Sequence, residues 1–235
     1  MRITKNLIQG FSQLFFPHVC AGCGSDLLTE KQFLCLRCLH ELPLTHFHLY
    51  ADNPVEKIFW GRVPIVAAYA HFYFSRHSAL QQVMHQLKYN GQREIGEHFG
   101  RMMGKGMSHS GRFDTVDALV PLPLYASREK KRGYNQAAVI CEGIAETMKL
   151  PLLTNAILRT HATETQTHKN RINRWQNMMD KFQLSRRDLL ENKHVLLVDD
   201  IITTGATLDA CANELLQAPG VKVSIAALAW TEASA

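Results

Sequence analysis

The chain has 235 residues, 46% of them hydrophobic and 20% charged, which is typical of a globular protein with one full core and a small accessory module. No stretch approaches the roughly 18 consecutive apolar residues that a membrane-spanning helix needs, so no membrane span is expected. The formal net charge of +5 permits a polyanionic partner without requiring one.

The first segment, residues 1–16, predicts an amphipathic helix, because Leu7, Phe11 and Leu14 recur at helical spacing and Pro17 follows. Polar residues interrupt its apolar run and no small-residue cleavage site comes after it, which does not fit a signal peptide. We therefore expect a cytoplasmic protein.

Residues 17–45 carry two CxxC pairs, Cys20 with Cys23 and Cys35 with Cys38, and are too few to hold a core of their own. Four thiolates complete the tetrahedral shell of a zinc ion and leave no open position, so we predict a structural rather than a catalytic metal. Disulfides fit a cytoplasmic chain poorly, and a redox CxxC would not need a second copy.

Residues 46–62 contain Asn53, Pro54 and Gly61, and we interpret them as a connector to a larger domain over 63–235. In that domain apolar strands alternate with helices, which is typical of an α/β fold whose mostly parallel sheet has helices on both faces. A polar, basic segment from Arg159 to Asn177 interrupts the alternation. We expect strands over 63–74, 116–123, 194–199 and 221–229, helices over 78–89, 93–107, 135–149 and 205–217, and buried side chains at Cys141 and Cys211.

The stretch HVLLVDDIITTGAT, residues 194–207, stops an apolar strand at Asp199 and Asp200 and then turns into a helix. Ligands bind beyond the carboxyl ends of parallel strands, and the unpaired amides at a helix N-terminus attract phosphate. The acids cannot bind phosphate, so they would serve sugar hydroxyls or a divalent cation, and a sugar phosphate satisfies both halves. The alternative, an N-capped helix beside surface aspartates, explains one threonine of the turn but not three.

The run VLLVDDIITTGAT resembles the phosphoribosyl-diphosphate (PRPP) signature of type I phosphoribosyltransferases. Together with the cysteine quartet, LKYNG (87–91), PLP (121–123), RGYNQA (132–137) and the segment holding Thr163, Gln166, Arg174 and Asn177, it resembles the ComF/GntX family along nearly the whole chain. The resemblance implies a phosphoribosyltransferase-like domain preceded by a zinc ribbon, with structural Zn²⁺ in the quartet and Mg²⁺ bound with PRPP.

The resemblance also implies roles for single residues. Asp199 and Asp200 would hold the ribose hydroxyls, directly or through Mg²⁺, and the loop 203–207 would hold the 5-phosphate. The segment from Arg159 to Asn177 would close over the diphosphate and stabilise its developing charge, unless it is only a solvated loop. The implied catalytic residues are Lys169, Arg171 and Arg174. The implied PRPP-binding residues are Asp199, Asp200, Thr203, Thr204, Gly205, Ala206, Thr207, Pro121, Leu122, Pro123 and Arg132.

The resemblance thus implies PRPP as the donor of a phosphoribosyl group, but no segment of the sequence identifies the acceptor. ComF relatives are associated with DNA uptake in natural transformation, so three hypotheses stay open. The first is a glycosyltransferase that passes phosphoribose to an unidentified acceptor. The second is a PRPP-sensing protein that binds single-stranded DNA through basic stretches such as REKKR (128–132). The third is a scaffold whose zinc module docks a competence helicase or a recombination mediator.

Overall fold

The computed structural model describes residues 19–26, 28, 32–160 and 181–232. The helix expected over 1–16 lies outside these residues, as do the three implied catalytic cations Lys169, Arg171 and Arg174. In the described part, no helix is both long enough and apolar enough to cross a membrane.

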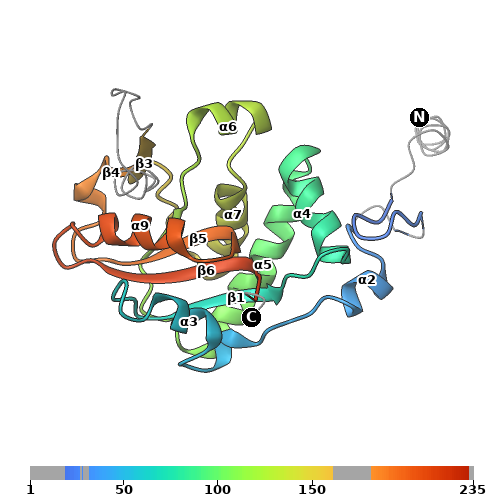
Figure 1. Cartoon of the computed structure of the whole chain (residues 1–235), viewed down its shortest axis with the longest axis horizontal. Coiled ribbons are helices and arrows are strands. Elements are labelled where there is room, and N and C mark those ends of the chain that lie inside the picture. The colour runs from blue at the N-terminus through green and yellow to red at the C-terminus, as the bar shows by residue number, and fades with distance from the viewer. Residues whose placement is uncertain (1–18, 27, 29–31, 161–180, 233–235) are drawn as a thin grey trace, which may run out of the picture.

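A four-stranded parallel sheet forms the centre of the protein (Figure 1). Its strands stand in the order β1 (Ala68–Tyr73), β6 (Lys222–Trp230), β5 (His194–Ile202) and β2 (Ala118–Pro121). The strand residues are nearly all buried, as expected for a sheet covered on both faces. The predicted parallel α/β sheet is confirmed.

Helices cover both faces of this sheet. α4 (Ala79–Tyr89), α5 (Arg93–Ser110) and α7 (Gln136–Met148) share one face, while α9 (Ala206–Leu215) packs on β5 and β6 from the other. α5 and α7 approach each other closely, since a Cβ on Gly100 would lie 2.1 Å from the carbonyl oxygen of Ile140. The glycines that weaken the helix pattern of 93–107 therefore permit a tight helix pair. Cys141 and Cys211 are fully buried in α7 and α9, as expected.

The segment that we interpreted as a connector is folded against the sheet edge. It holds the 3₁₀ helix η1 (Phe47–Leu49) and the helix α3 (Pro54–Phe59), and Val55 and Phe59 have no exposed surface. The buried Asn53 side chain accepts from the first amides of α3 and donates to the carbonyl of Ala68 in β1, at 2.8 Å. A buried polar side chain with all these partners ties the segment to the core.

Further elements of the structure were not expected. α6 (Ala126–Arg132) follows β2, and the 3₁₀ helix η2 (Arg187–Leu189) precedes β5. β3 (Ile157–Thr160) and β4 (Lys181–Leu184) form a separate antiparallel pair at the two ends of the basic segment. The sequence there is too polar to show strand periodicity. A short helix, α2 (Leu36–His40), belongs to the cysteine-bearing segment, which lies beside α4 (Figure 1).

Candidate functional site

Asp199 and Asp200 lie where β5 loses one of its two neighbours. The prediction that the strand ends at residue 199 is wrong, because β5 continues to Ile202 and stays paired with β6. On the other side, pairing with β2 stops at Val198. β2 is the shorter strand, so the two acids stand beside an open edge, and alternation along β5 directs them to opposite faces of the sheet.

The two acids have different partners. Lys88 of α4 places its ammonium 2.9 Å from a carboxylate oxygen of Asp200. Asp199 accepts a hydrogen bond from the Asp200 amide at 2.7 Å. Burial, together with the charge of Asp200, raises the pKa of Asp199 to about 7, although that amide, Lys88 and Arg159 act in the opposite direction. A cation arriving beside Asp199 would favour the ionised carboxylate and lower this pKa.

The loop 203–207 forms a small hollow of about 50 Å³ at the N-terminus of α9, and Asp199 lines it as well. Gly205 has a φ of +73° and is the residue before the first helical turn. Arg62, just after α3, donates to the carbonyl of Thr204 at 3.0 Å and forms an ion pair with Asp209 at 2.9 Å. The loop is therefore held from the segment that looked like a connector, and Thr203 and Thr204 are exposed to solvent.

A cleft of about 200 Å³ adjoins the hollow and shares Asp199 and Thr207 with it. The predicted residues Asp200, Leu122 and Arg132 line this cleft. Two of its other charged lining residues, Lys88 and Arg128, were not predicted, whereas Arg159 is the first residue of the basic segment that was expected to close over the diphosphate. Two signals pointed to them, since Lys88 lies in the LKYNG motif and Arg128 in the basic run REKKR, but neither placed them at the acids.

Arg132 and Arg159 are held by neighbours around this cleft. Arg132 donates to the buried Gln136 at 2.6 Å and stacks on Tyr89, with 5.6 Å to the ring centre. The Arg159 guanidinium stacks on Tyr125 at 4.2 Å. Stacked guanidiniums keep their charge and their remaining N–H donors, so they suit phosphate recognition.

The PLP turn divides between two cavities. Leu122 faces the cleft, and its amide donates to the carbonyl of Val198 at 2.8 Å. Pro121 and Pro123 instead line a larger neighbouring cavity of about 630 Å³. The two cavities share Leu124, Asn135 and Arg159. Of the three predicted residues of the turn, only Leu122 borders the cleft that holds the acids.

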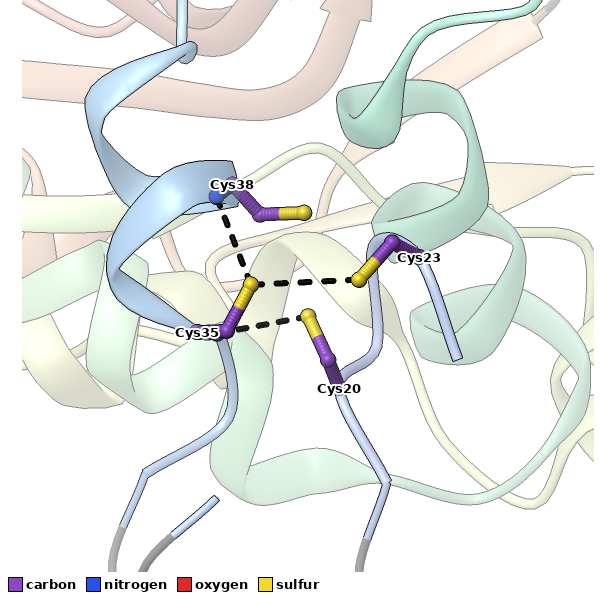
Figure 2. Close-up of side chains that lie close together, drawn as sticks. All are labelled: Cys20, Cys23, Cys35 and Cys38. Atoms are coloured by element: carbon purple, nitrogen blue, oxygen red, sulfur yellow. Dashed lines mark hydrogen bonds between the residues drawn. The ribbon is translucent and has the colours of Figure 1, made fainter. Parts of the chain in front are cut away.

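The four cysteines form one cluster, with their sulfurs pointing toward one another (Figure 2). The ligand atoms lie within 4.8 Å of one another, and the sulfurs of Cys23 and Cys35 are 3.8 Å apart. A tetrahedron with zinc–sulfur bonds near 2.3 Å has sulfur–sulfur edges of about 3.8 Å. The donor set and its spacing are compatible with a structural zinc ion.

The electrostatics of the cluster also favour a cation. Burial would raise the pKa of the Cys20 thiol, but hydrogen bonds from the amides of Cys35, Cys23 and Gly22 outweigh it and lower that pKa to about 6. Burial and the neighbouring thiols raise the pKa of Cys38. Four thiolates cannot share this small space without a compensating charge, and a dication among the sulfurs would supply it.

The cysteine cluster packs against helices α4 and α5 of the sheet domain. A Cβ on Gly22 would lie 3.1 Å from the Cβ of Ala79 at the start of α4. The rings of Phe33 and His98, the latter in α5, have centroids 5.7 Å apart. Because α4 also carries Lys88, the cluster and the cleft contact the same helix from opposite ends.

The chain is similar to several known proteins. Residues 135–235 match the family model described as phosphoribosyl transferase domain. The chain is 30% identical over 217 residues to the DNA utilization protein YhgH of Escherichia coli (strain K12), covering 91% of this chain and 90% of that protein. It is 28% identical over 211 residues to competence protein F of Haemophilus influenzae, covering 88% and 81%. It is 28% identical over 144 residues to competence protein ComFC of Bacillus subtilis, covering 61% and 56%.

Proposed function

The chain belongs to the ComF/GntX family of competence and DNA utilization proteins, and we propose that it acts on DNA that enters the cell, through a site that binds PRPP together with Mg²⁺. The observation that carries the proposal is that the hollow of loop 203–207 and the adjoining cleft share lining residues. The phosphate-sized loop at α9 and the basic cleft meet at Asp199 and Thr207. A ligand with a phosphate, a sugar and a diphosphate in series would span both.

Each part of PRPP has a proposed place. The 5-phosphate would take the hollow of loop 203–207, where amides and threonine hydroxyls donate to its oxygens. Asp199 and Asp200 would accept from the ribose hydroxyls or bind the metal. The diphosphate would lie among Arg128, Arg132 and Arg159, with the implied cations Lys169, Arg171 and Arg174 as a proposed closing loop.

The chemistry that fits this arrangement is phosphoribosyl transfer. The bond between C1 of the ribose and the diphosphate oxygen breaks, its electron pair leaves with the diphosphate, and a nucleophile forms the new bond to C1. Bound Mg²⁺ would supply charge to the leaving diphosphate. The arginines would stabilise the same developing charge, and their positions on aromatic rings limit the reorganisation this needs. The cavity of about 630 Å³ beside the cleft is our proposed place for the acceptor.

A second candidate function, binding of single-stranded DNA, is favoured by the alternation of arginines and aromatic rings around the same cleft. Rings on which bases stack, next to cations that take phosphates, are the usual elements of a sequence-independent single-strand site. The pairs whose arginine lines this cleft are Arg128 with Tyr125, Arg132 with Tyr89, and Arg159 with Tyr125. In this function PRPP would be a signal that controls binding.

A pyrophosphate-release assay distinguishes the two candidate functions. Purified protein with Mg²⁺ and PRPP is presented with nucleobases and with single-stranded DNA. Release that depends on one acceptor supports transfer. No release with any acceptor, combined with DNA binding that weakens steeply with salt and responds to PRPP, supports the sensor. If neither is seen, the protein is better explained as a scaffold whose cysteine module docks a helicase or a recombination mediator.

A further inference from the structure

The ion pair between Lys88 and Asp200 engages a carboxylate that we propose for a ribose hydroxyl or a metal ion. The ammonium nitrogen is 2.9 Å from the carboxylate oxygen, and the two side chains keep only 21% and 12% of their surface exposed. An ion pair so little exposed is weakly screened by salt. It is therefore a competitor that any other ligand of Asp200 has to replace.

The backbone of Lys88 is fixed at this place. Leu87, the preceding residue of α4, has no exposed surface, and its carbonyl accepts a hydrogen bond from the hydroxyl of Tyr134. Lysine carries its charge on a four-carbon stem with rotatable bonds, whereas an arginine fork is more rigid. The ammonium can thus move within the cleft while α4 stays in place.

The charges around the acids indicate where the ammonium would go. Lys88, Arg128, Arg132 and Arg159 all line the cleft that holds Asp199 and Asp200. A bare divalent cation entering there meets four positive groups and an acid that is already paired. A polyphosphate ligand meets the same groups favourably and offers Lys88 new oxygens, which leaves Asp200 open to a cation carried by that ligand.

We infer that Lys88 is a positioning residue that keeps a free divalent cation away from Asp199 and Asp200, and yields Asp200 only when a phosphorylated ligand accepts its ammonium. The inference rests on the proposed function in choosing PRPP as that ligand. It makes the binding of metal and diphosphate one coupled event. If the ion pair is purely structural, loss of Lys88 should instead change the stability of the protein but not its affinity for a free divalent cation.

The test compares Lys88→Met with Lys88→Arg and with Lys130→Met. Lys130 is exposed in α6 and does not line the cleft, so its replacement removes the same charge from a nearby position. Mn²⁺ binding is titrated by electron paramagnetic resonance in the absence of any phosphate. We expect Lys88→Met to bind Mn²⁺ at least about tenfold more tightly than wild type, and the other two variants to stay weak.

Equal Mn²⁺ affinity in wild type and Lys88→Met would overturn the inference, and so would a gain of the same size in Lys88→Arg or Lys130→Met. Thermal unfolding shows whether Lys88→Met is folded, and if it is not, Lys88→Gln replaces it. A second titration measures Mg²⁺–PRPP, for which Lys88→Met should lose about tenfold in affinity. Failure of wild type to bind PRPP would contradict the proposed function, while the phosphate-free Mn²⁺ comparison would still decide the role of Lys88.

Discussion

Gly205 lies against Ile58, so that a Cβ on Gly205 would come within 2.7 Å of the Cγ2 atom of Ile58 in α3. The same glycine has a φ of +73°, a conformation that other residues adopt with difficulty. The glycine of the loop 203–207 is thus required twice, once by its backbone conformation and once by the packing of α3.

We predict that Gly205→Ala lowers the free energy of unfolding by at least about 2 kcal/mol, because it adds a steric overlap to an unfavourable φ. Gly61→Ala is the matched control, since Gly61 has a φ of +70° with nothing within 4 Å of its added Cβ. That variant should lose about 1 kcal/mol. Urea unfolding measures both, and equal losses would show that the contact with Ile58 is unimportant.

The acids and the loop should be separable by mutation. Asp199→Asn combined with Asp200→Asn removes the groups proposed for ribose hydroxyls and metal, but leaves the amides of the α9 N-terminus. We expect affinity for PRPP to fall at least about tenfold, while ribose 5-phosphate still binds. Asp188→Asn, which alters an exposed ion pair with Arg186, is the control. Calorimetry with both ligands decides, and equal losses for the two would argue against separate places for phosphate and sugar.

The cysteine cluster should contain one zinc ion per chain, measurable by elemental analysis. Cys20→Ser removes a buried ligand that accepts a hydrogen bond from the Cys35 amide at 3.3 Å, so zinc content should drop sharply. Residues 17–45 should then become sensitive to protease while the sheet domain resists. A variant that keeps a full equivalent of zinc would contradict the four-thiolate site. Cys141→Ser, at a buried cysteine outside the cluster, should leave the zinc content unchanged.

A buried histidine predicts a loss of stability in mild acid. Burial, aided by His48 and His46, lowers the pKa of His71 to about 3, and neither of its ring nitrogens has a hydrogen-bond partner among the described residues. In the unfolded chain His71 is protonated below about pH 6.5, whereas in the folded protein it stays neutral down to about pH 3. The free energy of unfolding therefore falls as the pH drops from about 6.5 toward 3. From pH 7.5 to pH 5 this amounts to about 2 kcal/mol.

His71→Phe should remove this part of the pH dependence. Burial also lowers the pKa values of His48, His98 and His194, so some acid sensitivity remains in the variant. The difference in slope between wild type and variant isolates His71. Chemical unfolding at a series of pH values measures it, and parallel slopes would mean that His71 takes up its proton in the folded protein.

The parallel sheet was predictable from the sequence because runs of valine, isoleucine and leucine are typical of strands that are buried on both faces. The helices expected over 78–89 and 135–149 both form, and each begins directly after a residue whose side chain caps it, Ser78 before α4 and Asn135 before α7. The cysteine cluster was predictable from spacing alone, because the two CxxC turns and a tetrahedral ion require one another.

Contacts between distant segments were not predictable in the same way. The pairing of Lys88 with Asp200 joins two motifs that were both noticed, but no local pattern relates one to the other. Asn53 looked like a loop residue in the sequence. Its buried hydrogen bond to β1 could not be predicted, because it depends on β1 lying next to it in the fold. Arg62 holds the loop carbonyl of Thr204 from a segment of apparent connector composition. Each of these needs the tertiary structure, and each bears on the site.

The central claim is that the cleft and the loop hollow together bind PRPP with Mg²⁺, and calorimetry on the zinc-loaded wild-type protein tests it most directly. We predict saturable binding of PRPP at a single site per chain when Mg²⁺ is present. Binding should be much weaker when Mg²⁺ is removed by a chelator that leaves the zinc ion in place. If millimolar PRPP with Mg²⁺ gives no saturable heat on folded protein, the proposed ligand is wrong.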